Sequence, residues 1–173
     1  MTTTFYQTSP AYGTQSDWCE SNQAIGHVVH LHHTKLKRAI ELAIEIRRRM
    51  ETLFPLLDRL CRRTCRLCPD PCCLVATVWI DFRDLLFLHL NELPIPPAQL
   101  IQNLSQDCRY YGYRGCRLPR LLRPWACTLY LCGAQWRNLR RQPQSIQQAF
   151  DRNIATIKAQ RMDMEAIFIR IIR

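Results

Sequence analysis

Nine of the ten cysteines in this 173-residue chain fall in two clusters between residues 61 and 132. The first cluster reads CRRTCRLCPDPCC, and the second is spread over a Gly- and Pro-containing stretch. Thiolates at such spacings can bind a metal ion or carry out redox chemistry. The candidate metal ligands are Cys61, Cys65, Cys68, Cys72 and Cys73 in the first cluster, and Cys108, Cys116, Cys127 and Cys132 in the second.

Metal binding is the chemistry that these spacings favour. Cys65 and Cys68 form a C-x-x-C pair, the spacing that lets two thiolates reach one tetrahedral ion from a turn. The adjacent Cys72 and Cys73 cannot both point the same way from an extended backbone, so one packs while the other coordinates, or both serve a polynuclear site. We expect zinc or an iron–sulfur cluster that ties distant segments together, with binding contributing to folding. Nine thiols are enough for two four-sulfur sites with one spare, or for one site with bystanders.

A disulfide framework is the alternative, and composition argues against it. With 47% hydrophobic residues the chain can bury a core without cross-links. Its first residues, MTTTFYQTSPAYGTQSDW, show neither a basic region nor an apolar run that would predict export. No apolar stretch approaches the length of a membrane span. We therefore expect a cytoplasmic protein with no membrane partner, in a compartment where thiols stay reduced.

The positive charge of the chain comes almost entirely from arginine. The net charge is +10, and only Lys35, Lys37 and Lys158 of the 24 basic residues are lysines. Cations beside thiolates favour the metal-binding form, so arginines near the cysteines could compensate the charge of an anionic site. Solvation or phosphate binding are the alternatives, and nucleic acid is thus a second, less favoured partner. The arginines next to the clusters are Arg59, Arg62, Arg63, Arg66, Arg109, Arg114, Arg117, Arg120 and Arg123.

The two clusters together resemble the YkgJ family of cysteine-cluster proteins, whose proposed role is chelation of zinc or iron. That family has a Cys-rich run ending in a CC pair, then C-x7-C with Gly before the second Cys, then an Arg-Pro step followed by Cys. The matching residues cover roughly 61–132, and the resemblance implies metal chelation through them. They are Cys65, Cys68, Cys72 and Cys73, then Cys108, Gly115 and Cys116, then Arg123, Pro124 and Cys127.

The elements that position these cysteines are predicted to be helices. Residues 1–25 are rich in Thr, Ser and Gln and predict a flexible arm, followed by one helical domain over 26–173. Apolar residues at helical spacing predict a helix from about residue 27 to 54 that Pro55 kinks or ends. A similar stripe predicts a long final helix after Pro143, started by a capping box of Ser145 and Gln148. The stripes are Leu36, Ile40, Ala43, Ile46 and Met50, then Ile146, Phe150, Ile154, Ile157, Met164, Phe168 and Ile171.

Shorter elements are expected between the two long helices. Residues 74–80 could be a strand or a buried helix, and Asp81 is a plausible N-cap for a central helix over 82–90. A further helix is expected after Pro97, with Leu100, Ile101 and Leu104 on one face. The predicted fold class is mainly α. It is a helical bundle of two long amphipathic helices and short helices around a loop-rich, Cys-rich metal-binding core at 61–132.

Other residues give weaker functional signals. His27, His30 and His33 would share one side of an early helix and could hold a metal, although a solvated helix start explains them as well. Trp125, Tyr130 and Trp136 could shield a metal site or stack on bases. No phosphate loop or nucleophile motif is present, so enzymatic activity stays open. The leading hypothesis is a metal-binding protein, ahead of a zinc-stabilised nucleic-acid-binding module, a redox-active iron–sulfur protein, or a redox enzyme with metal-free reactive thiols.

Overall fold

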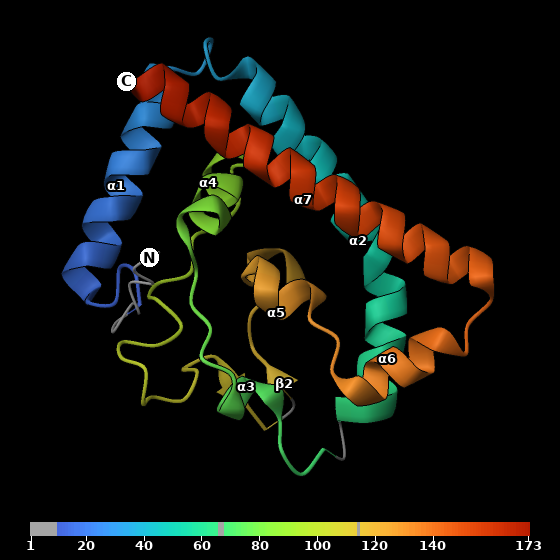
Figure 1. The fold of residues 1–173 in the computed structure, drawn as a ribbon. Helices are drawn as coiled ribbons and strands as arrows, with labels where there is room; N and C mark the ends of the chain where they lie inside the picture. The colour runs from blue at the N-terminus through green and yellow to red at the C-terminus, as the bar shows by residue number, and fades with distance from the viewer. Residues whose placement is uncertain (1–9, 66–67, 114) are drawn as a thin grey trace, which may run out of the picture.

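Helices dominate the computed structural model, which describes residues 10–65, 68–113 and 115–173 (Figure 1). The described side chains exclude that of Cys73, and Arg66 and Arg114 also lie outside the described residues. The elements are α1 (Gln15–Leu31), α2 (Lys37–Thr64), α3 (Cys72–Val75), α4 (Phe82–Leu90), β1 (Tyr111–Gly112), β2 (Gly115–Cys116), the 3₁₀ turn η2 (Arg120–Leu122), α5 (Trp125–Leu129), α6 (Gly133–Arg140) and α7 (Gln144–Ile172).

The two long helices α2 and α7 pack against each other, and the C-terminal part of α2 bends away from α7 toward α6 (Figure 1). Each buries one apolar stripe, as the 3.6-residue period predicts. On α2, Ala43, Ile46 and Met50 are buried, and on α7 the buried residues include Ile157 and Met164. The mainly helical fold class and both stripes are therefore confirmed. In the described residues, no helix combines the length and apolar character needed to span a membrane.

Helix α4 occupies the centre of the bundle, in contact with α1, α2 and α7. The Asp81 side chain accepts a hydrogen bond from the Asp84 backbone N–H (2.8 Å), while Asp84 accepts one from Asp81 N–H (3.2 Å). This reciprocal capping box confirms the predicted start of the helix. All residues from Leu85 to Leu88 are buried. Because this packing fixes α4, it also fixes the positions of Asp81 and Asp84 at the N-terminus of the helix.

The N-terminal expectations were partly wrong. Residues 15–25 belong to α1 rather than to a flexible arm, because Trp18 is buried and its indole N–H donates to Pro96 O (2.9 Å). The helix expected from residue 27 is instead split by a turn over residues 32–36. Of the two outcomes expected at Pro55, the structure has the kink and not the end, because α2 continues through Leu56, Leu57 and Leu60 to Thr64 and bends (Figure 1). A proline that removes one helical hydrogen bond accounts for such a bend.

Two middle segments also differ from expectation. After α3, residues 76–80 are irregular, and Val75 is 70% exposed, so the run 74–80 is neither a strand nor a buried helix. No helix follows Pro97 within 98–110. There, the side-chain oxygen of Gln99 accepts hydrogen bonds from the backbone N–H groups of Ile80 (2.8 Å) and Leu100 (2.9 Å). A buried side chain thus replaces helical hydrogen bonding.

The final helix begins as expected after Pro143 but without the predicted capping box. Pro143 is itself the N-cap residue, and no side-chain cap hydrogen bond is present. Ser145 consequently lies one residue inside α7, too late to cap it. Proline suits this position because its fixed φ prepares the chain for the first helical turn.

Candidate functional site

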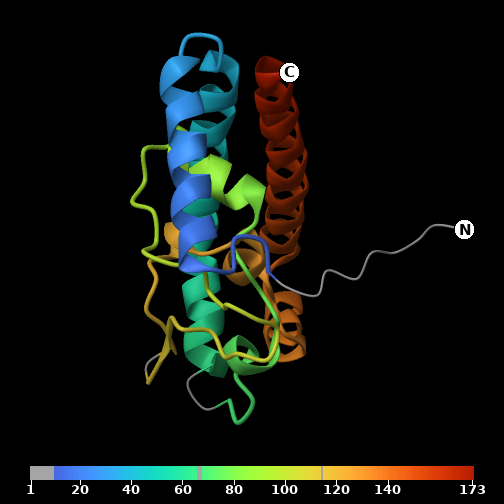
Figure 2. The same cartoon turned by 90° about the vertical axis from the view of Figure 1, so that its left-hand side faces the viewer.

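The second cysteine cluster is brought to the first by the loop-rich lower half of the molecule in Figures 1 and 2, which holds α3, the β1–β2 pair, α5 and α6. Cys72 begins α3, Cys116 ends β2, and Cys127 lies in α5. Gly115 has φ +98°, a conformation that glycine adopts far more readily than other residues. The glycine before Cys116 in the family-like pattern is therefore required by the β1–β2 turn.

Cys127 interacts electrostatically with three other thiols, those of Cys72, Cys108 and Cys116. Its pKa is raised to about 12, first by burial, then by Cys108 and Cys116, and less strongly by Asp84 and Cys72. Burial likewise raises the pKa of Cys108, and the nearby Cys116 adds to the effect. All four side chains are half-buried. Burial and the nearby thiols therefore favour the neutral form of Cys127 and of Cys108, because adjacent thiolates would repel one another.

A second pair of thiols lies at the C-terminal end of α2. Cys61 and Cys65, one helical turn apart, are hydrogen-bonded to each other. The Gln135 amide donates to both sulfurs, at 3.3 Å from Cys61 Sγ and 3.4 Å from Cys65 Sγ. Arg120 Nη2 donates to Cys61 Sγ at 3.4 Å and its Nε pairs with Asp58 at 2.6 Å.

These contacts shift the pKa values of the two thiols in opposite directions. The pKa of Cys61 is lowered to about 5, chiefly by the hydrogen bond from Cys65 and then by Arg120 and Gln135, against the opposing effect of burial. The pKa of Cys65 is raised, because it shares its proton with Cys61 and is partly buried. The two thiols therefore titrate as a coupled pair, and the Arg120 contact favours the thiolate at Cys61.

The remaining predicted cysteines lie outside both groups or are not described. Cys68 is exposed and its thiol donates to Asp70 O (3.3 Å). The side chain of Cys73 lies outside the described residues. Cys132 is the N-cap residue of α6, and its backbone N–H donates to Gln135 Oε1 (3.1 Å). Cys19 lies exposed on α1, where its sulfur accepts from Gln15 (3.4 Å).

Within the part of the chain that the structure describes, no three His, Cys, Asp or Glu side chains form a ready-made metal-binding group. His27, His30 and His33 are exposed, and His33 lies in the turn after α1. His89 is half-buried, and its Nε2 is 3.1 Å from Asn22 Oδ1.

The arginines predicted near the clusters differ in role. Arg120 contacts a thiol directly, and Arg109 lies near enough to Cys108 to favour its thiolate. Arg123 instead donates to Leu118 O (2.8 Å). Arg59, Arg62 and Arg63 are exposed. Charge compensation at the sulfurs thus has direct structural support at Arg120 and, through space, at Arg109.

A buried ion pair lies near Cys127, and the sequence analysis did not predict it. Arg161 of α7 donates to Asp84 at 2.8 Å, and both side chains are less than 10% exposed. Asp84 also accepts from the Trp125 backbone N–H (2.9 Å), which fixes the start of the helix carrying Cys127. Burial raises the pKa of Asp84 to about 6, against the opposing effect of Arg161. Trp125 covers the guanidinium of Arg161 (5.3 Å to the ring centre), while Tyr130 and Trp136 are largely exposed.

Gln135 was also missed, because its role depends on residues 70 and more positions away. Its C-x-x-Q spacing from Cys132 matches the geometry of a helix cap, although Cys is not a usual cap residue. That spacing was the one signal available in the sequence.

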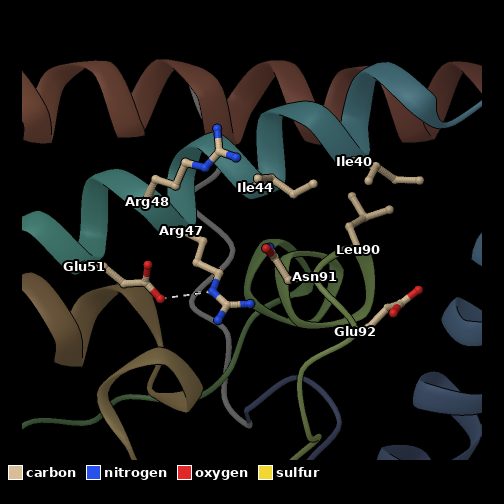
Figure 3. Close-up of a pocket in the computed structure, with 8 residues that line it drawn as sticks. All are labelled: Ile40, Ile44, Arg47, Arg48, Glu51, Leu90, Asn91 and Glu92. Atoms are coloured by element: carbon tan, nitrogen blue, oxygen red, sulfur yellow. Dashed lines mark hydrogen bonds and ion pairs between the residues drawn. The ribbon is translucent and has the colours of Figure 1, made fainter.

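One open hollow on the described surface lies away from the cysteines (Figure 3). It has a volume of about 470 Å³, and an ion pair between Arg47 and Glu51 (3.0 Å) crosses its edge. Arg47 is 14 residues before Cys61 on α2, which is roughly 20 Å along the helix. The hollow is lined by Ile40, Ile44, Arg47, Arg48, Glu51, Leu90, Asn91 and Glu92.

Comparison of the chain with protein-family models, with curated proteins and with solved structures gave no match.

Proposed function

We propose that this chain is a metal-binding protein that holds zinc or an iron–sulfur cluster through Cys72, Cys108, Cys116 and Cys127. The observation that carries the proposal is the mutual interaction of the Cys127 thiol with the other three. These residues come from α3, from the chain before β1, from β2 and from α5. Four half-buried thiols from separate segments are the kind of donor set that a soft or borderline metal favours.

The chemistry of the group fits a cation. Burial and the neighbouring thiols favour the neutral form of Cys127 and of Cys108. A bound metal would replace their protons and balance the charge of the resulting thiolates. All-sulfur ligation suits structural zinc and iron–sulfur clusters alike, and an iron–sulfur cluster would add redox chemistry.

The resemblance to the YkgJ family points the same way. The four proposed ligands are all part of its pattern, and Gly115 has the backbone conformation that the turn before Cys116 needs. Cys68 and Cys73 belong to the same pattern and are further candidates. The proposed ligand set leaves out Cys61 and Cys65, whose thiols are hydrogen-bonded to each other and to Gln135.

Metal analysis of anaerobically purified protein tests this function. We expect stoichiometric zinc, or stoichiometric iron with acid-labile sulfide and visible absorption. Cys127→Ser should abolish metal retention, since it removes the thiol that interacts with the other three. Cys19→Ser is the matched control, because Cys19 is exposed on α1, and it should retain the metal. Trace metal in the wild-type protein, or full metal in Cys127→Ser, would contradict the proposal.

A further inference from the structure

The thiol pair at the end of α2 lies in an environment built from three elements. Cys61 and Cys65 come from α2, Arg120 from η2 and Gln135 from α6. Gln135 is only 4% exposed, so its amide has been taken out of water and directed at the two sulfurs. Its two N–H bonds can serve both sulfurs together, and its oxygen is held by the Cys132 backbone N–H. The amide is therefore fixed at both ends.

The two thiols of the pair are not equivalent. Arg120 contacts Cys61, and it is itself held by its ion pair with Asp58 and by the Phe54 ring, 5.9 Å from the guanidinium carbon. A cation and an amide donor at one sulfur stabilise a thiolate there. Cys65 is the more exposed of the two and is the C-cap residue of α2. The charged sulfur is thus half-buried, and its partner faces solvent.

The geometry also suits bond formation between the two sulfurs. Residues four apart on a helix have Cα atoms about 6 Å apart, within the range that a disulfide spans. Cys65 is the C-cap residue of α2, and its backbone N–H donates to Cys61 O. The Cβ atoms of such a pair are about 5–6 Å apart on a regular helix, so closing the bond requires the end of α2 to unwind locally and bring them to about 4 Å.

We propose that Cys61 and Cys65 form a redox-active dithiol that undergoes thiol–disulfide exchange with small disulfides, with Cys61 as the attacking sulfur. This activity goes beyond the metal site and does not depend on it.

The exchange proceeds in two balanced steps. The Cys61 thiolate attacks one sulfur of the small disulfide, whose S–S bond breaks, and the first thiolate leaves with the bonding electron pair. Cys65 then gives up its proton and attacks Cys61, so that the mixed disulfide breaks and the second thiolate leaves. After protonation of both leaving groups, the dithiol has lost two electrons to the small disulfide, which has become two thiols.

Exposure of the full chain to oxidised glutathione, followed by alkylation and peptide mapping, tests this proposal. Wild-type protein should form the Cys61–Cys65 disulfide and release two glutathione molecules per chain. Cys65→Ser should stop at a stable mixed disulfide on Cys61. Cys61→Ser should leave Cys65 no more modified than Cys19, and Cys19→Ser should behave as the wild type.

Variants of the surrounding donors separate this role from mere accessibility. Arg120→Gln should slow the first exchange roughly tenfold or more, the size of one charge-assisted hydrogen bond. Arg137→Gln is the matched control, because Arg137 is an exposed arginine of α6, and it should leave the rate unchanged. If Cys61→Ser fails to fold, the wild-type map and the Cys65→Ser trap still decide the question.

Two results would overturn the proposal. One is a glutathione map in which Cys61 stays unmodified while other cysteines react. The other is a stoichiometric loss of bound metal in Cys65→Ser with metal protecting Cys61 from alkylation, which would make the pair part of a metal site.

Discussion

Asp84 links three parts of the molecule through a single carboxylate. It caps α4, accepts from the Trp125 backbone at the start of α5, and pairs with Arg161 of α7. Its ion pair is almost fully buried, so neither charge has water available as an alternative partner. Breaking such a pair leaves an uncompensated charge in the interior, which costs far more than the net worth of the pair.

We therefore predict that Asp84→Ala lowers the free energy of unfolding by about 3 kcal/mol, because the Trp125 N–H loses its acceptor and Arg161 keeps only the longer pair with the half-exposed Asp81 (3.6 Å). Urea unfolding followed by circular dichroism measures the loss. Replacing Arg161 by Met in the same chain should restore part of the stability. Asp163→Ala, at an exposed position of α7, should change it by less than about 0.5 kcal/mol. A small loss in Asp84→Ala would contradict the assignment of a buried ion pair.

At the scale of the elements, Pro55 lies inside α2 and lacks the N–H for one helical hydrogen bond, yet the helix continues past it. The helix runs on to the Cys61–Cys65 pair with Leu53, Leu56 and Leu57 buried on either side of the proline. Packing against the core therefore holds the two halves in one helix, although a helix-interior proline costs about 3 kcal/mol relative to alanine.

Pro55→Ala should increase the free energy of unfolding by about 1–2 kcal/mol. It restores one backbone hydrogen bond and removes a ring clash, while the gain is reduced by about 1 kcal/mol because the unfolded chain becomes more flexible. Denaturant midpoints of the variant and the wild type measure the difference, with the exposed Arg59→Ala as control. A loss of stability would mean that packing requires the bend of α2.

The contact between α1 and α4 predicts a pH dependence. Burial lowers the pKa of His89, which contacts Asn22 of α1. The folded protein therefore binds fewer protons than the unfolded chain just below the ordinary histidine pKa of about 6.5, so stability falls as the pH drops through that value. The free energy of unfolding should decrease more between pH 7.5 and 5 in the wild type than in His89→Gln. Equal decreases would refute the role of His89.

At the scale of the whole molecule, the helical bundle and the cysteine-bearing half have different sources of stability. The bundle is held by the apolar faces of α2, α4 and α7. The other half consists of short elements and loops, and β1 and β2 are only two residues long. A ligand that joins three of its segments would add stability that its small apolar contacts do not supply. Nucleic-acid binding by the arginine surplus stays a prediction.

If the proposed metal site exists, the metal and the fold should be thermodynamically coupled. Adding zinc at about 1,000 times its dissociation constant should stabilise the metal-free protein by about 4 kcal/mol, seen as a rise in Tm by calorimetry. For an iron–sulfur protein, oxidative loss of the cluster should lower Tm instead. Cys127→Ser should show no metal-dependent change. A Tm that is the same with and without metal would refute the coupling.

The sequence by itself determined the elements whose signals are local. The apolar periods of α2 and α7 and the Asp81 cap of α4 could be predicted because a helix buries a regular stripe and a cap acts within one turn. The prediction of a helix after Pro97 was wrong because the Gln99 side chain hydrogen-bonds to the backbone of Ile80, 19 residues away. The prediction of a flexible arm up to residue 25 was wrong because the Trp18 side chain is buried and donates a hydrogen bond to Pro96 O.

The candidate sites divide in the same way. Cysteine spacing identified the thiols, and only the tertiary structure decided which of them meet. It grouped Cys127 with Cys72, Cys108 and Cys116, and it paired Cys61 with Cys65 beneath Gln135 and Arg120. Cys61 and Cys65 are one helical turn apart, but the contacts of Cys61 with Arg120 and Gln135 join residues more than 50 positions apart. The same holds for Cys127 and Cys72. Such contacts depend on how the helices pack, and no local pattern in the chain records that packing.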